Sequence, residues 1–115
     1  MSVQPYPLWS SDRQLLASRD RRTGERIFPA LPDASPLAGH HDTAAIEGEG
    51  VVYSYTVIHP SAKSGQAPYA LGYVDFAGPV RIFGRLLGSD QPAIGQRFRP
   101  CPDDAFGYVF EAVQA

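Results

Sequence analysis

The stretch "GEGVVYSYTVIHP", residues 48–60, decides the fold class of this chain. Almost every residue from Val51 to Ile58 is β-branched or aromatic, which favours a β-strand. Together with the preceding "AAIE" this run predicts one long strand, and the two glycines near its middle predict a bulge or a bend. Strands need such bends when a sheet curls into a barrel.

Four later segments continue the β pattern and predict four more strands: Tyr69–Phe76, Val80–Gly88, Gln96–Pro102 and Ala105–Val113. In the second of these, residues 80, 82 and 86 take one face, and Arg81, Phe83 and Arg85 take the other. Five strands with an interruption after the third are the layout of an OB-fold, a small and partly open barrel. An SH3-like barrel is the main alternative, but the long glycine-kinked first strand favours the OB-fold.

The residues before this run have a different pattern. The first seven residues include two prolines and predict an extended arm, while residues 8–20 predict a short helix capped by Ser10 or Ser11. A strand over Gln14–Ser18 is the alternative. Three prolines between Phe28 and Asp42 exclude a regular helix and predict an ordered loop.

Composition and charge exclude several classes of protein. The 115 residues include 10 Lys and Arg against 12 Asp and Glu, so the chain lacks the basic excess of a dedicated nucleic-acid-binding domain. A lone cysteine, Cys101, forms no disulfide within the chain and is expected to be inert, since no neighbouring base activates it. The sequence shows neither a signal peptide nor a membrane span, so a cytoplasmic protein without membrane contact is expected.

Aromatic and basic side chains of the expected barrel are the candidate ligand contacts. An exposed aromatic platform is predicted from Tyr53, Tyr55, Tyr69, Tyr73 and Phe83, although about half of such residues usually belong to a core. Arg81 and Arg85, with Lys63 in the loop after His59, are placed to meet phosphates. The predicted ligand-binding residues are therefore Tyr53, Tyr55, His59, Lys63, Arg81 and Arg85.

Catalytic and metal-binding constellations are not apparent in the sequence. His59 has no triad spacing with a nucleophile or a carboxylate and is more simply a polar residue at the end of a strand. His40 and His41 are adjacent, and adjacent side chains of an extended segment point in opposite directions, which counts against one shared ion. We therefore expect neither an enzyme active site nor a metal site.

The order of short motifs resembles a known family. "GEGVVYSYTVIH", then "APYALGYVDF", "VRIFGRLLG" and the "IG" at residues 94–95 are similar to the zinc-ribbon/OB-fold proteins that accompany thiolase-like acyl-CoA enzymes, a family long catalogued as a domain of unknown function. The resemblance covers roughly residues 15–110. It implies a mainly β protein in which residues 1–42 form an arm and a ribbon-like hairpin, and residues 43–115 form the five-stranded OB-fold barrel.

In this family the ribbon usually carries two Cys-x-x-Cys knuckles, which this chain lacks. Ser18 lies near the place of the first thiolate, and the resemblance implies a retained hairpin without zinc. Its turn is expected at Arg21–Gly24, where Gly24 supplies a positive φ.

The resemblance implies a function without catalysis. Family members bind thiolase-like or acyl-CoA-processing enzymes, so an accessory subunit that contacts an acyl-coenzyme A thioester is expected, with no resident cofactor. Tyr6, Leu8 and Trp9 of the arm are expected to dock on the partner or on a second copy of this chain. The alternative is an OB-fold protein that binds single-stranded nucleic acid.

Overall fold

In the computed structural model, residues 8–10, 13–31, 35–36, 38–88 and 91–113 are described. They form eight strands and two 3₁₀ turns, η1 (Ala38–His40) and η2 (Ala62–Ser64), and within these ranges there is no α-helix. The chain divides into two compact units. The first runs to Gly48 and includes Phe76–Val80, and the second contains residues 49–75 and 81–115. No helix in the described part is long and apolar enough to cross a membrane.

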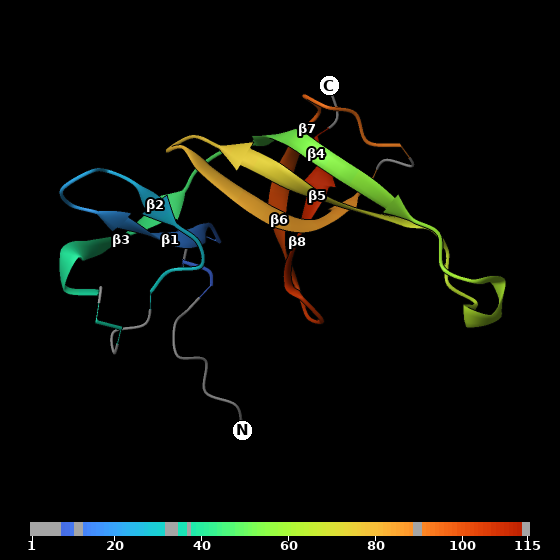
Figure 1. Cartoon of the computed structure of the whole chain (residues 1–115), viewed down its shortest axis with the longest axis horizontal. Helices are drawn as coiled ribbons and strands as arrows, with labels where there is room; N and C mark the ends of the chain where they lie inside the picture. Colours follow the sequence, from blue (N-terminus) through green and yellow to red (C-terminus); the bar gives the residue numbers. More distant parts are fainter. Residues whose placement is uncertain (1–7, 11–12, 32–34, 37, 89–90, 114–115) are drawn as a thin grey trace. The chain divides into compact units, whose positions relative to one another are not determined.

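The first unit is built on an antiparallel sheet of three strands in the order β2-β1-β3 (Figure 1). Its strands are β1 (Leu15–Asp20), β2 (Arg26–Ile27) and β3 (His41–Ile46). Leu15, Ala17 and Ile46 are almost completely buried. This sheet is held by six residue pairs between β1 and β3, from Leu15↔Ile46 to Asp20↔His41.

The short helix expected over residues 8–20 is wrong, because residues 15–20 form β1. Arg13 has a φ of 63°, a left-handed conformation that an α-helix does not allow. Before it, Trp9 forms a β-bridge with Leu15, and the backbone N–H of Leu16 donates to the carbonyl of Leu8 at 2.9 Å. The strand alternative was the correct one, since Leu15 and Ala17 lie buried two residues apart, as the period of a strand requires.

The turn between β1 and β2 is as predicted. Gly24 has a φ of 77°, and its N–H donates to the carbonyl of Asp20 at 2.8 Å. The N–H of Asp20 in turn donates to the carbonyl of Glu25, so backbone hydrogen bonds close the hairpin. The charged sequence of this turn is therefore solvated surface on a backbone-bonded hairpin.

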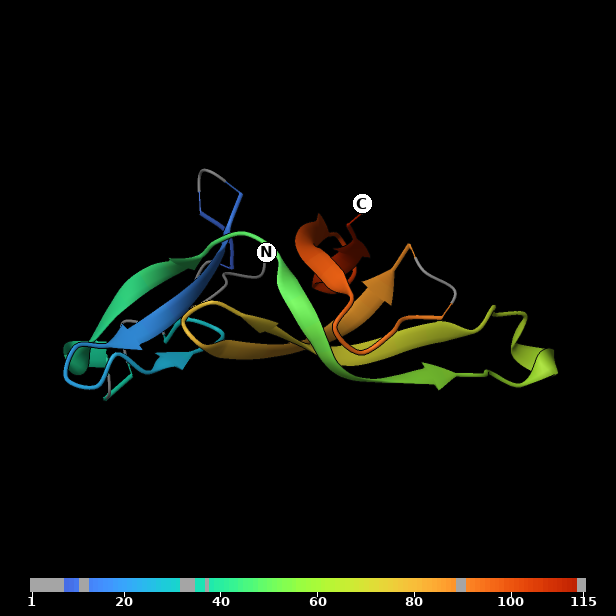
Figure 2. The same ribbon diagram turned by 90° about the horizontal axis from the view of Figure 1, so that it is seen from above.

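The second unit contains the ring of five strands, which confirms the predicted mainly β fold with an OB-fold barrel (Figures 1 and 2). The strands are β4 (Gly50–Ile58), β5 (Tyr69–Phe76), β6 (Val80–Leu87), β7 (Arg97–Asp103) and β8 (Gly107–Ala112). Their order is β4-β5-β6-β8-β7, and β7 pairs with β4 at Gly50↔Phe98 and Val51↔Arg97. The loop with η2 extends from the end of the β4–β5 hairpin, as both views show.

The long first strand that the sequence suggests is two strands. β3 ends at Ile46 and pairs with β1, whereas β4 starts at Gly50 and enters the ring. Gly48 lies between them with a φ of 74°, so the residue expected to bend a strand instead ends one and leads into the next.

A β-bulge in β4 decides which aromatic side chains share a face. The register between β4 and β5 shifts between Val52 and Ser54, so that Val52 is opposite Val74 but Ser54 is opposite Tyr73. Tyr55 is thereby opposite Gly72, whose missing Cβ would point at the buried Leu86. The bulge leaves Tyr53 on the outside of the ring and moves Tyr55, which is still 39% exposed, to the opposite face of β4.

Aromatic side chains pack over the junction between β6 and β8, where the five-stranded barrel has few hydrogen bonds. β6 and β8 are parallel and pair only at Leu86↔Phe110 and Leu87↔Glu111. Next to these pairs, a Cβ on Gly84 would lie 2.6 Å from Cε2 of Phe110 and 3.0 Å from the ring of Tyr108. The hydroxyl of Tyr108 donates to the carbonyl of Phe83 at 2.5 Å, and burial raises the pKa of this phenol. Gly84 is therefore required for the rings to lie against the backbone of β6.

This contact predicts a large effect of one methyl group. Gly84→Ala should lower the free energy of unfolding by about 1–3 kcal/mol, because the ring of Phe110 is fully buried and has no space to move away. Gly39→Ala is the matched control, since a Cβ at Gly39 meets nothing within 4 Å. Urea unfolding followed by tryptophan fluorescence measures both variants, and equal stabilities would contradict this account.

Candidate functional site

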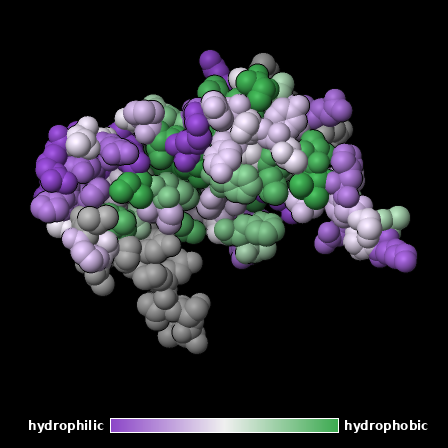
Figure 3. All heavy atoms as spheres, in the orientation of Figure 1, coloured by the Kyte–Doolittle hydropathy of each residue, from purple (hydrophilic) through white to green (hydrophobic). Residues whose placement is uncertain are grey.

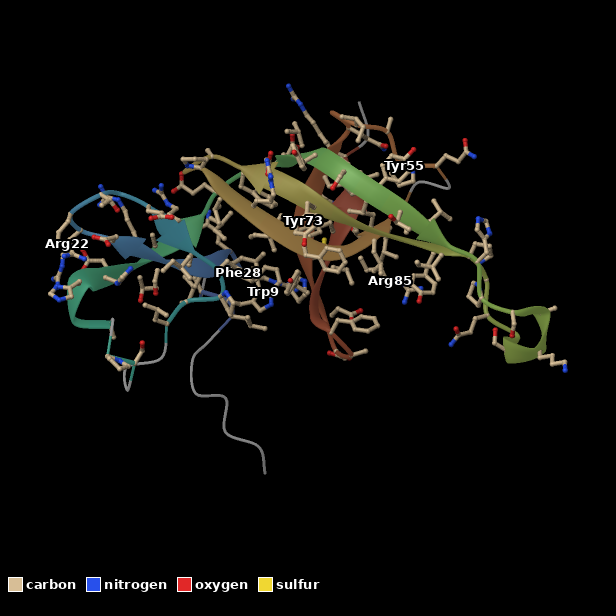
Figure 4. The ribbon with its side chains drawn as sticks, viewed as in Figure 1. Trp9, Arg22, Phe28, Tyr55, Tyr73 and Arg85 are labelled. Atoms are coloured by element: carbon tan, nitrogen blue, oxygen red, sulfur yellow. The ribbon has the colours of Figure 1, made fainter. Side chains whose placement is uncertain are left out.

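The outer surface of β4, β5 and β6 holds three of the six predicted ligand-binding residues, Tyr53, Arg81 and Arg85. Buried and exposed residues alternate along β6, which confirms that Arg81, Phe83 and Arg85 share the face opposite to Ile82 and Leu86. Residues 69, 71 and 73 of β5 take the same outer side, because residues 70, 72 and 74 between them are buried. Four of the five predicted platform aromatics lie there: Tyr53, Tyr69, Tyr73 and Phe83. In Figure 4, Tyr73 and Arg85 lie below the β4 ribbon and Tyr55 lies above it.

Arg81 has a partner within the barrel. Its Nε and Nη2 donate to the two carboxylate oxygens of Asp75 at 2.6 and 3.1 Å, and its guanidinium lies 3.5 Å from the ring centroid of Tyr53. The hydrogen bond to Asp75 raises the pKa of Arg81 further above its ordinary value. A side chain that is already neutralised by a bidentate carboxylate is a weak candidate for a phosphate contact.

Arg85 is in a different environment. Its guanidinium lies between two aromatic rings, 4.7 Å from the centroid of Tyr69 and 5.8 Å from that of Phe106. No described carboxylate forms an ion pair with it, and its buried Nε has no hydrogen-bond partner. Arg85 is therefore a cation that an anionic ligand would stabilise.

A hollow of about 660 Å³ opens next to this arginine. It lies within the second unit and is lined mainly by aromatic and apolar side chains, with Arg85 as its only charged residue among those described: Gln66, Ala67, Pro68, Tyr69, Leu71, Phe83, Gly84, Arg85, Phe106 and Tyr108. An apolar hollow with one cation suits a ligand that combines a flat or aliphatic part with an anionic group.

Phe106, like Tyr108, is an aromatic member of this hollow that sequence reasoning missed. It lies in the β7–β8 turn, where Oδ2 of Asp103 accepts hydrogen bonds from the N–H groups of Ala105 and Phe106. The turn holds the ring outward, and 59% of the residue is exposed. An aromatic residue in the polar turn "DDAFG" was the available signal.

His59 and Lys63 lie apart from the first hollow. His59 lines a second one of about 620 Å³, which shares residues 67–69 and Arg85 with the first. Lys63 lies on the exposed turn η2 and lines neither hollow. In Figure 3, hydrophilic atoms gather over this loop and over the β1–β2 turn, while paler and apolar ones cover much of the barrel strands.

The predicted partner contacts in the arm are only partly described. Leu8 and Trp9 are half-buried, and their backbones are bonded to β1 of the same chain. Tyr6 lies outside the described residues.

The ribbon-like hairpin does not offer a zinc ion a suitable set of donors. Ser18, which lies near the place of the first thiolate, is 3% exposed, and its Oγ accepts a hydrogen bond from the N–H of Leu31 at 2.7 Å. Asp20 accepts from the N–H of Arg22 at 2.8 Å, and this bond is the main reason why the pKa of Asp20 is lowered. Among the described residues, no three His, Cys, Asp or Glu side chains are close enough to hold a metal ion. Ser18 and Asp20 instead accept hydrogen bonds from backbone N–H groups.

Three further residues singled out by the sequence are placed by the structure. His40 is exposed in η1, whereas the His41 side chain is 7% exposed and its Nε2 lies 4.0 Å from a carboxylate oxygen of Asp20. The Cys101 thiol donates to Glu111 at 3.2 Å. Burial and this carboxylate raise the pKa of Cys101, which makes it a poor nucleophile at neutral pH.

Comparison with known proteins confirms the resemblance. The sequence pattern of the family described as "ChsH2, C-terminal OB-fold domain" matches residues 43–101. A solved structure described as the Ltp2-ChsH2(DUF35) aldolase is similar, with a TM-score of 0.65 and 25% sequence identity, over 88% of this chain and 86% of the other. Among curated proteins none matches.

The hydrogen-bonded hairpin predicts that the chain needs no zinc. We expect metal analysis of the purified protein to find far less than one zinc per chain and a chelator to leave the melting temperature unchanged. Ser18→Ala should instead destabilise the protein by about 1 kcal/mol, because the Leu31 N–H loses its acceptor. Ser64→Ala, on the exposed turn η2, is the control and should have a smaller effect. Stoichiometric zinc, or unfolding by the chelator, would overturn this prediction.

Proposed function

Because this chain belongs to the family of the ChsH2 C-terminal OB-fold domain, we propose that it is a non-catalytic accessory subunit of a thiolase-like or other acyl-CoA-processing enzyme. The observation that carries the proposal is the likeness to the Ltp2-ChsH2(DUF35) aldolase over most of both chains. In that structure the related domain is named together with an enzyme. The outer surface of the barrel supports the proposal, since exposed aromatic residues and arginine are typical of contacts with a partner or a ligand.

The described residues offer no catalytic group of their own. Cys101 has a raised pKa and donates to a carboxylate, while His59 lines its hollow together with mainly apolar residues and Arg85. A nucleophile next to a base, which covalent catalysis requires, is not found among them. The partner enzyme would therefore provide the catalytic residues, and the barrel would provide a binding surface.

We place the ligand contact of this accessory subunit at Arg85. An acyl-coenzyme A thioester combines phosphates, a flat adenine ring and an apolar acyl chain. The hollow next to Arg85 offers several aromatic walls and one cation that no described carboxylate neutralises, and these suit such groups. Tyr69 and Phe106 belong to this contact with Arg85, and His59 borders it from the second hollow.

Single-stranded nucleic acid is a weaker candidate for the same surface. The exposed row of aromatic residues favours it, since such rows stack bases in OB-folds. Arg81, however, is neutralised by Asp75, and acidic residues outnumber basic ones in the chain. A backbone-tracking groove needs several free cations, which counts against this function.

Complex formation with an enzyme tests the proposal. We expect co-expression with the thiolase-like enzyme encoded nearest to this chain's gene to give a stable complex in size-exclusion chromatography with light scattering. The complex should turn over an acyl-CoA substrate, and this chain by itself should not. Separate elution of the two proteins at concentrations of about 10 µM would contradict the proposal, because stable subunits associate more tightly. Binding of oligothymidylate to this chain at low salt would favour the alternative.

The ligand contact has a separate test. Arg85→Gln should weaken the binding of coenzyme A to the complex by roughly tenfold or more, because one charge-assisted hydrogen bond contributes about 1.5–3 kcal/mol. Arg97→Gln is the matched control, since Arg97 is an exposed barrel arginine that lines neither hollow. Isothermal titration measures both. An unchanged affinity in Arg85→Gln would remove this site and leave the accessory role standing.

A further inference from the structure

The outer surface of β4–β6 carries three exposed aromatic residues that the ligand contact does not explain. Tyr53, Tyr73 and Phe83, which we call the aromatic face, are 53%, 44% and 46% exposed. Of these, only Phe83 borders the hollow next to Arg85. Tyr73 and Phe83 pack edge-on, with their ring centroids 5.0 Å apart. The face is therefore a preformed surface of rigid rings that lies directly beside the proposed ligand contact.

The charges within the aromatic face cancel. Arg81 and Asp75 form a bidentate pair, and the same guanidinium lies over the ring of Tyr53. Neither group of this pair therefore requires a counter-charge from a partner. A polyanion would gain little here, because the cation is already occupied.

This composition is that of the centre of a protein interface. Tyr, Phe and Arg are enriched there, and Lys and Glu are depleted. Rigid rings lose little conformational entropy on association, since Tyr and Phe have only two side-chain torsions. A second copy of the same face would bring two Arg81–Asp75 pairs together and desolvate both, so a different partner surface fits better.

We propose that the aromatic face docks the enzyme subunit, through a largely aliphatic and uncharged surface of that subunit. This inference rests on the proposed accessory function. Phe83 borders both the face and the hollow, so an enzyme docked on the face lies next to a ligand held at Arg85. The aromatic face thus binds the enzyme, and Arg85 binds the ligand.

Association measurements on the co-expressed pair test the docking surface. Tyr53→Ser and Tyr73→Ser should each weaken binding of the enzyme at least tenfold, as expected for aromatic residues at the centre of an interface. Tyr73→Phe keeps the ring and should bind almost as the original chain does. Ile94→Ser is the matched control, because Ile94 is 65% exposed in the loop before β7 and lies outside the face. Circular dichroism and melting temperature check that each variant is folded.

The salt dependence gives a second measurement. Because the charges of the face cancel, the affinity should change less than about threefold between low and high salt, where exposed ion pairs are screened. Arg85→Gln should leave the affinity for the enzyme unchanged while it weakens coenzyme A binding. A steep loss of affinity with salt would overturn the uncharged partner surface.

The outcomes separate the two proposals. If the unaltered chain binds no enzyme, the accessory function fails and the docking surface fails with it. If the unaltered chain binds and both serine variants bind equally well, the docking surface is overturned and the accessory function stands. If the serine variants instead abolish self-association of this chain, the face is an interface between copies and the inference is overturned.

Discussion

The packing of two aromatic rings against a glycine holds the barrel together where two parallel strands are paired over a short length. β6 and β8 share only two residue pairs, and the rings of Tyr108 and Phe110 cover the adjoining backbone at Gly84. The same Tyr108 donates to the carbonyl of Phe83, which fixes that part of β6. Because Phe83 and Arg85 flank Gly84 and share the outer side, this packing also positions the candidate ligand site. A change that loosens the closure is therefore expected to disturb the outer surface as well.

The hairpin of the first unit illustrates a second constraint, which is the need to satisfy backbone groups in a ribbon-like hairpin that has no cysteine. A zinc site stabilises a small ribbon because it fixes several loops at one point. In this chain Ser18 accepts from the N–H of Leu31 and Asp20 accepts from that of Arg22, so two polar side chains each fix one backbone segment. The arginines of this turn surround a hydrogen-bonded hairpin.

The sequence was sufficient for the parts of the fold that depend on local pattern. Alternation along β6 gave the correct faces, and the turn at Gly24 followed from its chemistry. The other elements of the fold depend on pairing between strands that are distant in the sequence. Leu15–Asp20 became a strand because β3 pairs along its whole length, and the strand expected through Gly48 divided because its two halves pair with different sheets. The bulge before Ser54 moved Tyr55 away from the other aromatic residues, and no local signal places a bulge to within one residue.

The two arginines of β6 show why a candidate site needs the structure. Arg81 and Arg85 are four residues apart on one face, and the sequence predicts that both contact phosphates. Their neighbours differ: Asp75 lies across from Arg81 and neutralises it, whereas Arg85 lies between the rings of Tyr69 and Phe106 and pairs with no carboxylate among the described residues. A paired arginine contributes shape and hydrophobic stem to a surface, while an unpaired one attracts an anion. The proposed division of one strand face into a surface for a protein and a contact for a ligand rests on this difference in partners.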